Sequence, residues 1–588
     1  MGVTRMNHLN LVTKKTLFWI LLLVAVIFLA ACSDEQSTGE ESPNKETEFA
    51  GGWPYATVPT GHYNMFVANA IDLKFYRELH QLPLATYNAV SDDYSALLAD
   101  GWELSEDKKQ LIVKLKDDVV WHSGTPFTAE DVRTTFLMYK LAGNPVWNYI
   151  DEVEVVNDQE VAFHIREETT MIYRYILRKP IVDTETYGAY ATQVDELIEA
   201  GEEETSAKWQ ELVADFTNFR PETVNATGPY YLDPANVSQS HVELVKNESS
   251  FLADTVNFDK VVVYNGDVPD LTPLVLNKRI DYLTHQFPAA SMETFAGAGY
   301  DTLELQGVDG LAMYFNAGKE PFDQVEVRQA LAYVIDRDSI GEVALPGITR
   351  GTKYVSGMGD LMTETWIDPS KLIDYKVDLD QATELLETAG LTLEDGKWKK
   401  PDGSPFTLTI QAPATWTDAA TAAAEVAQQL TAFGIDATFD GIDPLVRQSN
   451  INDGNFDVAL SFFGTGQPHP FFAYETPLLV SNANAPKGLG YEMTQQTKEA
   501  GTVDLEQLLT ESTRGWDEDA QKKIVEKIAY TVNETVPYLP IYSKWTQNIT
   551  SDGLRTEWGG NDDLYLNSAG DDNFAIIKIL NGDLKPID

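Results

Sequence analysis

The sequence predicts an α/β protein built on mixed sheets. Between residues 380 and 460, helix-type and strand-type apolar patterns alternate along the chain. Within residues 314–340 the apolar period changes from that of a strand to that of a helix. The content of 43% hydrophobic and 11% aromatic residues indicates a globular chain with a sizeable core. Helices that alternate with strands are typical of sheets whose faces carry helices.

The N-terminus has the pattern of a signal peptide, predicted at residues 1–31. A basic segment precedes an apolar run at residues 17–31, which is shorter than the roughly 20 residues that a membrane-spanning helix needs. The run ends before Cys32, and its last letters with this cysteine, LAAC, resemble the bacterial lipobox. This resemblance implies cleavage before Cys32 and lipidation of its sulfur. An uncleaved anchor is the alternative. Residues 32–52 are polar and charged, which predicts a flexible acidic tether.

Charge and cysteine content exclude several classes of partner. The net charge is −48, from 43 basic and 91 acidic residues, and this excludes nucleic acid. Cys32 is the only cysteine, so its lipidation leaves none for a disulfide or a cysteine metal site. No metal or cofactor is expected. With so many acidic residues, pairs of carboxylates that look catalytic arise by chance.

The first half of the chain predicts strands and helices in quick succession. Thr128 with Asp131 three residues later is the pattern of a helix N-cap. Residues 187–216 are acidic and helical in pattern. Strands are expected at residues 97–104, 110–115, 153–156, 161–165, 242–246 and 260–264, and helices at residues 128–141 and 268–276.

The second half begins with an amphipathic helix. Its apolar positions fall at i, i+3, i+4, i+7 and i+8 from Val327 to Ile335. Further helices are expected at residues 380–390, 419–433 and 519–532, and strands at residues 406–411, 435–439, 456–460 and 538–542.

Three segments carry a resemblance to a known family. Residues 314–340, YFNAGKEPFDQVEVRQALAYVIDRDSI, resemble the central signature of the family 5 solute-binding proteins, the extracytoplasmic receptors of ABC importers. Residues 98–140 and the GPYYL turn at residues 228–232 are similar to two further signatures. The resemblance implies a two-lobed periplasmic-binding-protein fold (type II, cluster C) with mixed sheets, a hinge and an extra small domain in the first lobe.

The same resemblance implies the domain boundaries and the partners. Lobe I would comprise residues 53–88, 215–313 and 544–588, the extra domain residues 89–214, and lobe II residues 314–543. The protein would act as a monomer, not an enzyme. It would be held to the membrane by the lipid on Cys32 and would deliver a small oligomeric solute to the permease subunits.

The class of ligand is predicted from the loop at residues 461–472, SFFGTGQPHPFF. Peptide-binding members of the family place an aspartate here to pair with the amino group of the peptide, and this loop contains no acid. Burial of an ammonium group without an anionic partner costs on the order of several kcal/mol. Amide, imidazole and aromatic groups instead suit a neutral polyhydroxyl ligand. The prediction is an oligosaccharide of the β-gluco or xylo type.

The candidate ligand contacts combine this loop with isolated aromatic residues. Tyr63 and Asn64 belong to a YNMF segment that looks like a pattern of carbohydrate-associated members. For the isolated tryptophans and for Tyr63, packing in the core is the alternative. The predicted contacts are Tyr63, Asn64, Trp366, Trp416, Gln467, His469, Phe471, Phe472 and Trp545.

Three alternatives to the sugar receptor stay open at this point. The first is an oligopeptide receptor of the same importer class, with an unrecognised acid that supplies the charge. The second is a surface glycoside hydrolase, which would need two carboxylates at a separation that a sequence does not reveal. The third is a receptor that feeds a signalling pathway. No zinc motif, phosphate loop or nucleophile elbow is present to favour an enzyme.

Overall fold

The computed structural model describes residues 46–89, 91–464, 466–483, 487–560, 567 and 572–587. The predicted signal peptide, Cys32 and most of the predicted tether lie outside these residues. The chain divides into two units, residues 1–46 and residues 47–588, and every helix and strand of the described ranges belongs to the second unit. None of the helices in the described ranges combines the length and the apolar character needed to cross a membrane.

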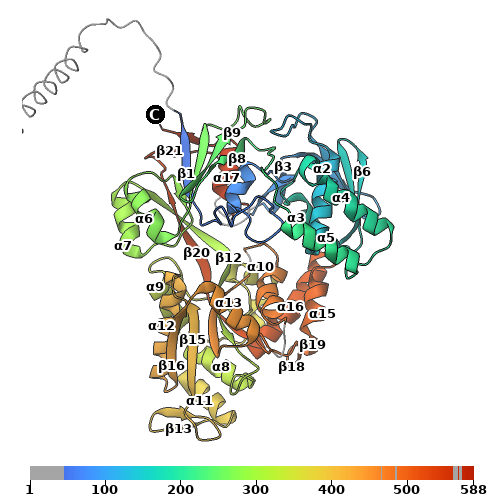
Figure 1. The fold of residues 1–588 in the computed structure, drawn as a ribbon. Helices are drawn as coiled ribbons and strands as arrows, with labels where there is room; N and C mark the ends of the chain where they lie inside the picture. The colour runs from blue at the N-terminus through green and yellow to red at the C-terminus, as the bar shows by residue number, and fades with distance from the viewer. Residues whose placement is uncertain are drawn as a thin grey trace, which may run out of the picture. The chain divides into compact units, whose positions relative to one another are not determined.

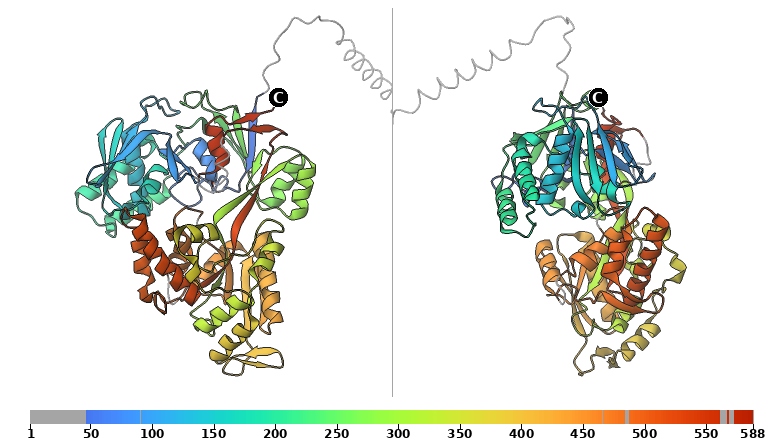
Figure 2. Two further views of the ribbon diagram at one scale, coloured as in Figure 1. Left: turned by 180° about the vertical axis from the view of Figure 1, so that it is seen from behind. Right: turned by 90° about the vertical axis from the view of Figure 1, so that its right-hand side faces the viewer.

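A ten-stranded mixed sheet runs through the second unit. β12 and β20 are antiparallel neighbours in its middle, and Figures 1 and 2 show them side by side. β1 is parallel to β10, and β15 is parallel to β16, so the predicted mixed α/β fold is confirmed. The strand order is β16 (Asp436–Ile442), β15 (Thr407–Pro413), β17 (Val458–Phe463), β12 (Asp301–Phe315), β20 (Tyr538–Thr550), β11 (Tyr282–Leu283), β1 (Glu48–Gly52), β10 (Lys260–Tyr264), β9 (His241–Lys246) and β8 (Tyr230–Val237).

Strand β1 corrects the predicted extent of the tether. The predicted flexible tether covers residues 32–52, whereas Glu48–Gly52 pair with β10 along their whole length. Phe49 and Ala50 are fully buried. A Cβ atom at Gly51 would collide with the side chain of Tyr76, so glycine is required for this close approach. The strand was missed because two apolar residues followed by two glycines show no alternation.

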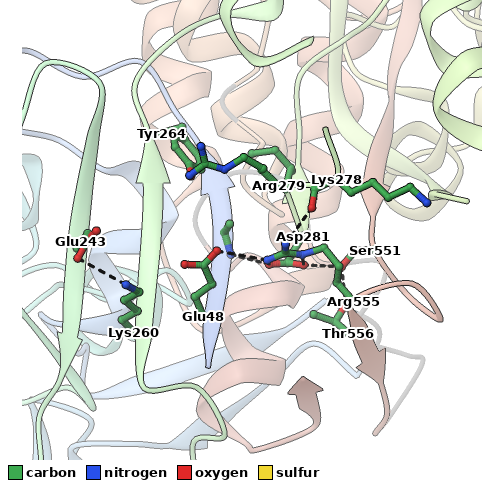
Figure 3. A network of polar contacts seen from close by, with 12 residues as sticks. Glu48, Glu243, Lys260, Tyr264, Lys278, Arg279, Asp281, Ser551, Arg555 and Thr556 are labelled. Carbon is green, nitrogen blue, oxygen red and sulfur yellow. Dashed lines mark hydrogen bonds and ion pairs between the residues drawn. The ribbon is translucent and has the colours of Figure 1, made fainter. Parts of the chain in front are cut away.

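A network around Asp281 ties β1 to the C-terminal segment (Figure 3). The fully buried carboxylate of Asp281 accepts hydrogen bonds from Ala50 N at 2.8 Å, Ser551 Oγ at 2.7 Å and Arg555 Nε at 2.8 Å. Burial raises the pKa of Asp281, and the hydrogen bonds from Arg555 and Ser551 oppose this rise. The Glu48 carboxylate lies 3.5 Å from Arg555. The start of the folded unit is thereby attached to residues near its end.

The two ends of the sheet pack into different cores. Leu305 on β12 packs with the core beside β8–β10, and we call this part the first lobe. Leu311 on the same strand packs with the core beside β15 and β17, in the second lobe. The β12–β20 ladder is irregular between Gln306 and Gly310, between these two positions. The lobe boundaries at residues 313/314 and 543/544 stay a prediction.

A four-stranded sheet lies beside the first lobe. Its order is β4-β5-β7-β6, and α2 begins at the predicted cap, where Asp131 Oδ2 accepts from Thr128 N at 2.9 Å. The elements of this region are β2 (Ala85–Asn88), β3 (Asp93–Ala96), β4 (Ala99–Leu104), β5 (Gln110–Leu115), α2 (Ala129–Leu141), β6 (Ile150–Asn157), β7 (Glu160–Ile165), α3 (Ile172–Leu177), α4 (Thr184–Glu199) and α5 (Ala207–Asn218).

The remaining helices surround the two ends of the large sheet (Figure 1). The predicted amphipathic helix is α8, and its apolar stripe from Val327 to Val334 is buried. In the first lobe the elements are α6 (Val268–Leu276), α7 (Ala289–Gly297), β21 (Thr556–Trp558), α17 (Phe574–Leu580) and β22 (Leu584–Pro586). In the second lobe they are α8 (Val325–Val334), α9 (Arg337–Ala344), α10 (Asp360–Trp366), α11 (Leu379–Thr388), β13 (Thr392–Glu394), β14 (Lys397–Lys399), α12 (Thr417–Ala432), α13 (Pro444–Asp453), α14 (Pro470–Tyr474), β18 (Thr494–Thr497), β19 (Gly501–Asp504), α15 (Leu505–Ser512) and α16 (Glu518–Thr535).

Candidate functional site

The 461–472 loop contacts both lobes. It leaves the end of β17 in the second lobe, and Gln467 Oε1 accepts a hydrogen bond of 2.9 Å from Arg174 Nε on α3. The ring of Phe472 lies 6.4 Å from that of Tyr175, also on α3. Phe471 packs against buried residues of both the first-lobe and a second-lobe core. The loop singled out by its missing acid therefore lies where the two lobes meet.

His469 is a buried, neutral group in this loop. Its side chain is 8% exposed, and Nδ1 accepts from Phe471 N at 3.1 Å, which caps helix α14. Burial lowers its pKa to about 4, with the side chain of Gln521 acting in the opposite direction. The ring of Trp366 meets it edge-on, with centroids 4.9 Å apart. The structure thus brings together two of the predicted contacts.

A pair of rings and two cations lie at the base of the loop. The rings of Trp416, before α12, and Phe462, at the end of β17, have centroids 5.4 Å apart and are tilted by 34°. The guanidinium carbon of Arg447 is 5.4 Å from the Trp416 ring centroid, and Lys544 Nζ is 5.1 Å from that of Phe462. Both rings are half-buried. We call Trp416 and Phe462 the ring pair.

Of these four residues, only Trp416 is among the ligand contacts predicted from the sequence. Phe462 belongs to the 461–472 segment but is not among the predicted contacts, although its place directly after the predicted strand at residues 456–460 was a signal. Arg447 lies on α13 and Lys544 on β20, in segments without a distinguishing pattern. Only the fold brings them beside the loop.

Three other predicted contacts lie in different surroundings. Asn64 is fully buried, and its Nδ2 donates to Phe216 O at 3.2 Å while its Oδ1 accepts from Phe66 N, so the fold already uses this amide. Tyr63 lines a first-lobe cavity of about 220 Å³. Trp545 is half-buried on β20, opposite Gln306.

No metal site emerges from the described ranges. They contain no group of three or more His, Cys, Asp or Glu side chains arranged to hold a metal ion. The ring pair and the amide and imidazole of the loop are instead groups that stack on and hydrogen-bond to an organic ligand.

Comparison with known proteins identifies the class. Residues 93–485 match the family model described as bacterial extracellular solute-binding proteins, family 5 middle. The nickel-binding periplasmic protein of Escherichia coli is 25% identical over 552 residues, which cover 90% of this chain and 92% of that protein.

Two solved structures share the fold. One is a periplasmic oligopeptide-binding protein of an ABC transporter from Thermotoga maritima, with mannohexaose bound; its TM-score is 0.70 at 18% identity, covering 93% of this chain and 99% of that one. The other is the oligopeptide-binding protein AppA of Bacillus subtilis with a nonapeptide; its TM-score is 0.66 at 18% identity, covering 93% and 100%. The chain therefore belongs to family 5 of the bacterial extracellular solute-binding proteins, the binding receptors of ABC importers, and is not an enzyme.

Proposed function

We propose that this receptor captures an oligosaccharide of the β-gluco or xylo type between its lobes and delivers it to the importer permease. The observation that carries the proposal is the ring pair of Trp416 and Phe462 at the base of a loop that contacts both lobes and contains no acid. Aromatic rings pack on the apolar faces of sugars, and Gln467 and neutral His469 supply polar groups for hydroxyls. A relative of the same fold binds mannohexaose.

A thermal-shift screen of residues 33–588 against neutral and acidic oligosaccharides and peptides tests this proposal. A ligand at 100 times its dissociation constant stabilises the folded state by about 2.7 kcal/mol. We expect a shift with an oligosaccharide that is recovered intact, and loss of that shift in Trp416→Ala. A shift with peptides alone would refute the sugar assignment.

A specific observation keeps the oligopeptide receptor as the second candidate. Asp309 on β12 is half-buried and lies against Gly464 of the loop. This acid lies outside the loop sequence and is not among the predicted contacts, and its carboxylate could pair with the amino group of a peptide. If the ligand is a peptide, Asp309→Asn should weaken its binding, and the same variant should leave the binding of an oligosaccharide unchanged.

We further propose that the lobes close around the ligand and that the receptor is a monomer. The irregular β12–β20 segment between Gln306 and Gly310 is a candidate hinge, because the chain changes from one core to the other there. Small-angle X-ray scattering should give a smaller radius of gyration with ligand and a monomer mass in both states. An unchanged radius would contradict closure.

Family 5 receptors act outside the cytoplasm, and we propose that lipid on Cys32 holds this one at the membrane. Each buried methylene of an acyl chain contributes about 0.8 kcal/mol to membrane binding, and two chains anchor a protein firmly. Cys32→Ser should release the protein or leave an unprocessed precursor. A Cys32→Ser protein that remains processed and membrane-bound would refute the anchor.

A further inference from the structure

We infer that Arg447 at Trp416, together with Lys544 at Phe462, forms a carboxylate-binding subsite, so that the ligand of this receptor carries a carboxylate group. The inference rests on the proposed function in one respect: the ring pair is taken as the place where the ligand lies. It adds a charge requirement to the polyhydroxyl ligand proposed above.

The first observation is that Arg447 is buried with most of its donor capacity unused. The side chain is 5% exposed, and among the described residues only Nη1 has hydrogen-bond partners, Leu460 O at 3.2 Å and Ser461 Oγ at 2.6 Å. Nε is buried and has no hydrogen-bond partner in the same ranges. Burial lowers the pKa of the Arg447 guanidinium. An arginine has five N–H donors, so a planar acceptor can still be bound at this group.

The second observation is that no acid compensates this charge. Within the described part of the chain no carboxylate lies within ion-pair distance of Arg447, although the sequence has 91 acidic residues. The buried Asp418, two residues after Trp416, accepts a hydrogen bond from Tyr542 Oη at 3.3 Å instead. A buried guanidinium without an anion is costly unless an anion arrives from outside.

Two of the three other buried arginines in the described ranges show what full compensation looks like, whereas the third, Arg337, has Nη1 without a hydrogen-bond partner there. Arg328, 4% exposed, donates from all three nitrogens to backbone carbonyls, among them Thr535 O and Phe322 O. Arg178, 7% exposed, is paired with Glu78 and Asp572. Arg447 has neither set of partners, and unlike Arg328 and Arg178 it borders the 461–472 loop.

The third observation is the arrangement of the surrounding groups. Arg447 lies over Trp416, Phe462 is beside Trp416, and Lys544 lies over Phe462. In the described ranges Lys544 also has no carboxylate within ion-pair distance. Each ring of the pair thus has a cation over it. A carboxylate of the ligand would receive a charge-assisted hydrogen bond from the guanidinium, which is stronger than a neutral one.

The carboxylate could come from two sources, a uronic acid residue of an oligosaccharide or the C-terminus of a peptide. Calorimetry on the soluble receptor, residues 33–588, separates them with matched ligand pairs. The sugar pair is a xylo-oligosaccharide bearing a glucuronic acid branch and its methyl ester. The peptide pair is an oligopeptide with a free C-terminus and the same peptide amidated.

The expected result is that the free acid of one pair binds about 10- to 100-fold more tightly than its neutral partner, because a charge-assisted hydrogen bond supplies that range. Arg447→Gln should remove the difference, and Lys544→Gln should reduce it. Arg350→Gln, the same charge change at an exposed arginine of the second lobe, should leave it intact.

Each outcome decides something. Preference for the uronate supports the subsite and the sugar receptor together. Equal binding of uronate and ester overturns the subsite and leaves the sugar receptor standing. Preference for the free C-terminus, with no sugar bound, supports the subsite and overturns the proposed sugar. If Arg447→Gln does not fold, the two ligand pairs still test the subsite on the unaltered protein and on the Lys544→Gln variant. Equal binding of the free acid and its neutral partner in both pairs would overturn the subsite.

Discussion

Arg328 and Arg447 are both buried arginines of the second lobe, but they differ in how many of their N–H groups have hydrogen-bond acceptors. Arg328 Nε, Nη1 and Nη2 all donate to carbonyl oxygens, and two of these, Thr535 O and Val536 O, lie at the C-terminus of α16. Such carbonyls have no partner within the helix, so the arginine completes the helix end. Arg447 completes no backbone group of this kind and keeps Nε without a partner in the described ranges.

The difference teaches how to separate a structural cation from a binding one. Burial alone does not distinguish them, since the two side chains are 4% and 5% exposed. What differs is whether the folded chain already supplies the acceptors. A buried group left without them costs stability in the free protein, and such a cost is typical of binding sites, where a ligand removes it.

The largest effect that this comparison predicts is on stability, at Arg328. Arg328→Met should lower the free energy of unfolding by about 3–5 kcal/mol, because it leaves several buried carbonyl groups without donors. Urea denaturation followed by tryptophan fluorescence measures this. The ligand affinity of the molecules that still fold should be unchanged. A loss of less than about 1 kcal/mol would mean that the carbonyls find other donors and that the comparison fails.

The next effect concerns His469, a buried group of the loop that is kept neutral. Its folded pKa of about 4 lies below the ordinary value of 6.5, so the unfolded chain binds more protons between these pH values. The contribution of His469 to the free energy of unfolding is therefore largest above pH 6.5 and decreases as the pH falls from 6.5 to about 4. Below pH 4 it does not change further with pH. The change is about 3 kcal/mol at most, since one pKa unit corresponds to 1.36 kcal/mol.

The variant His469→Asn tests this contribution, because asparagine can still cap α14 and does not titrate. Unfolding free energies at pH 7 and at pH 4.5 should differ less in the variant than in the unaltered protein. His80, whose pKa burial lowers to about 3, contributes to the same pH range and is left in place in both proteins. An unchanged pH dependence would show that His469 is not kept neutral by burial.

A smaller change in stability is expected at Arg447. Arg447→Met removes an uncompensated buried cation and breaks only the bonds to Leu460 O and Ser461 Oγ. We expect the free energy of unfolding to change by less than about 1 kcal/mol, or to rise, because apolar replacements of poorly compensated buried charges are often neutral or stabilising. The two variants are measured under one set of conditions. If Arg447→Met lost as much free energy of unfolding as Arg328→Met, Arg447 would be a structural residue.

The smallest stability effect is expected at Lys544. It is half-buried, lies over Phe462, and has no ion-pair partner within the described residues. Lys544→Gln should change the free energy of unfolding by no more than about 0.5 kcal/mol, as a surface substitution does. The melting temperature should accordingly change little. A larger loss would indicate that Lys544 supports the β12–β20 ladder and not the ligand.

Much of this protein is determined by its sequence alone. The change of period at residues 314–340 predicted the end of β12 and the helix α8, and the cap at Thr128 predicted the start of α2. These elements were predictable because their signals, apolar period and capping residues, act over a few neighbouring residues. The missing acid of the 461–472 loop also pointed to a segment that lies between the lobes.

Tertiary structure alone decided which side chains meet. β1 is a strand because β10 and β11 lie on its two sides, although its own five residues show no strand period. Arg447, Trp416 and Lys544 come from α13, the start of α12 and β20, and no local pattern relates them. Whether a buried cation is compensated depends on acceptors far away in the chain, as with Phe322 and Thr535 around Arg328. Electrostatic partners are set by distance in space, which the order of residues along a chain does not contain.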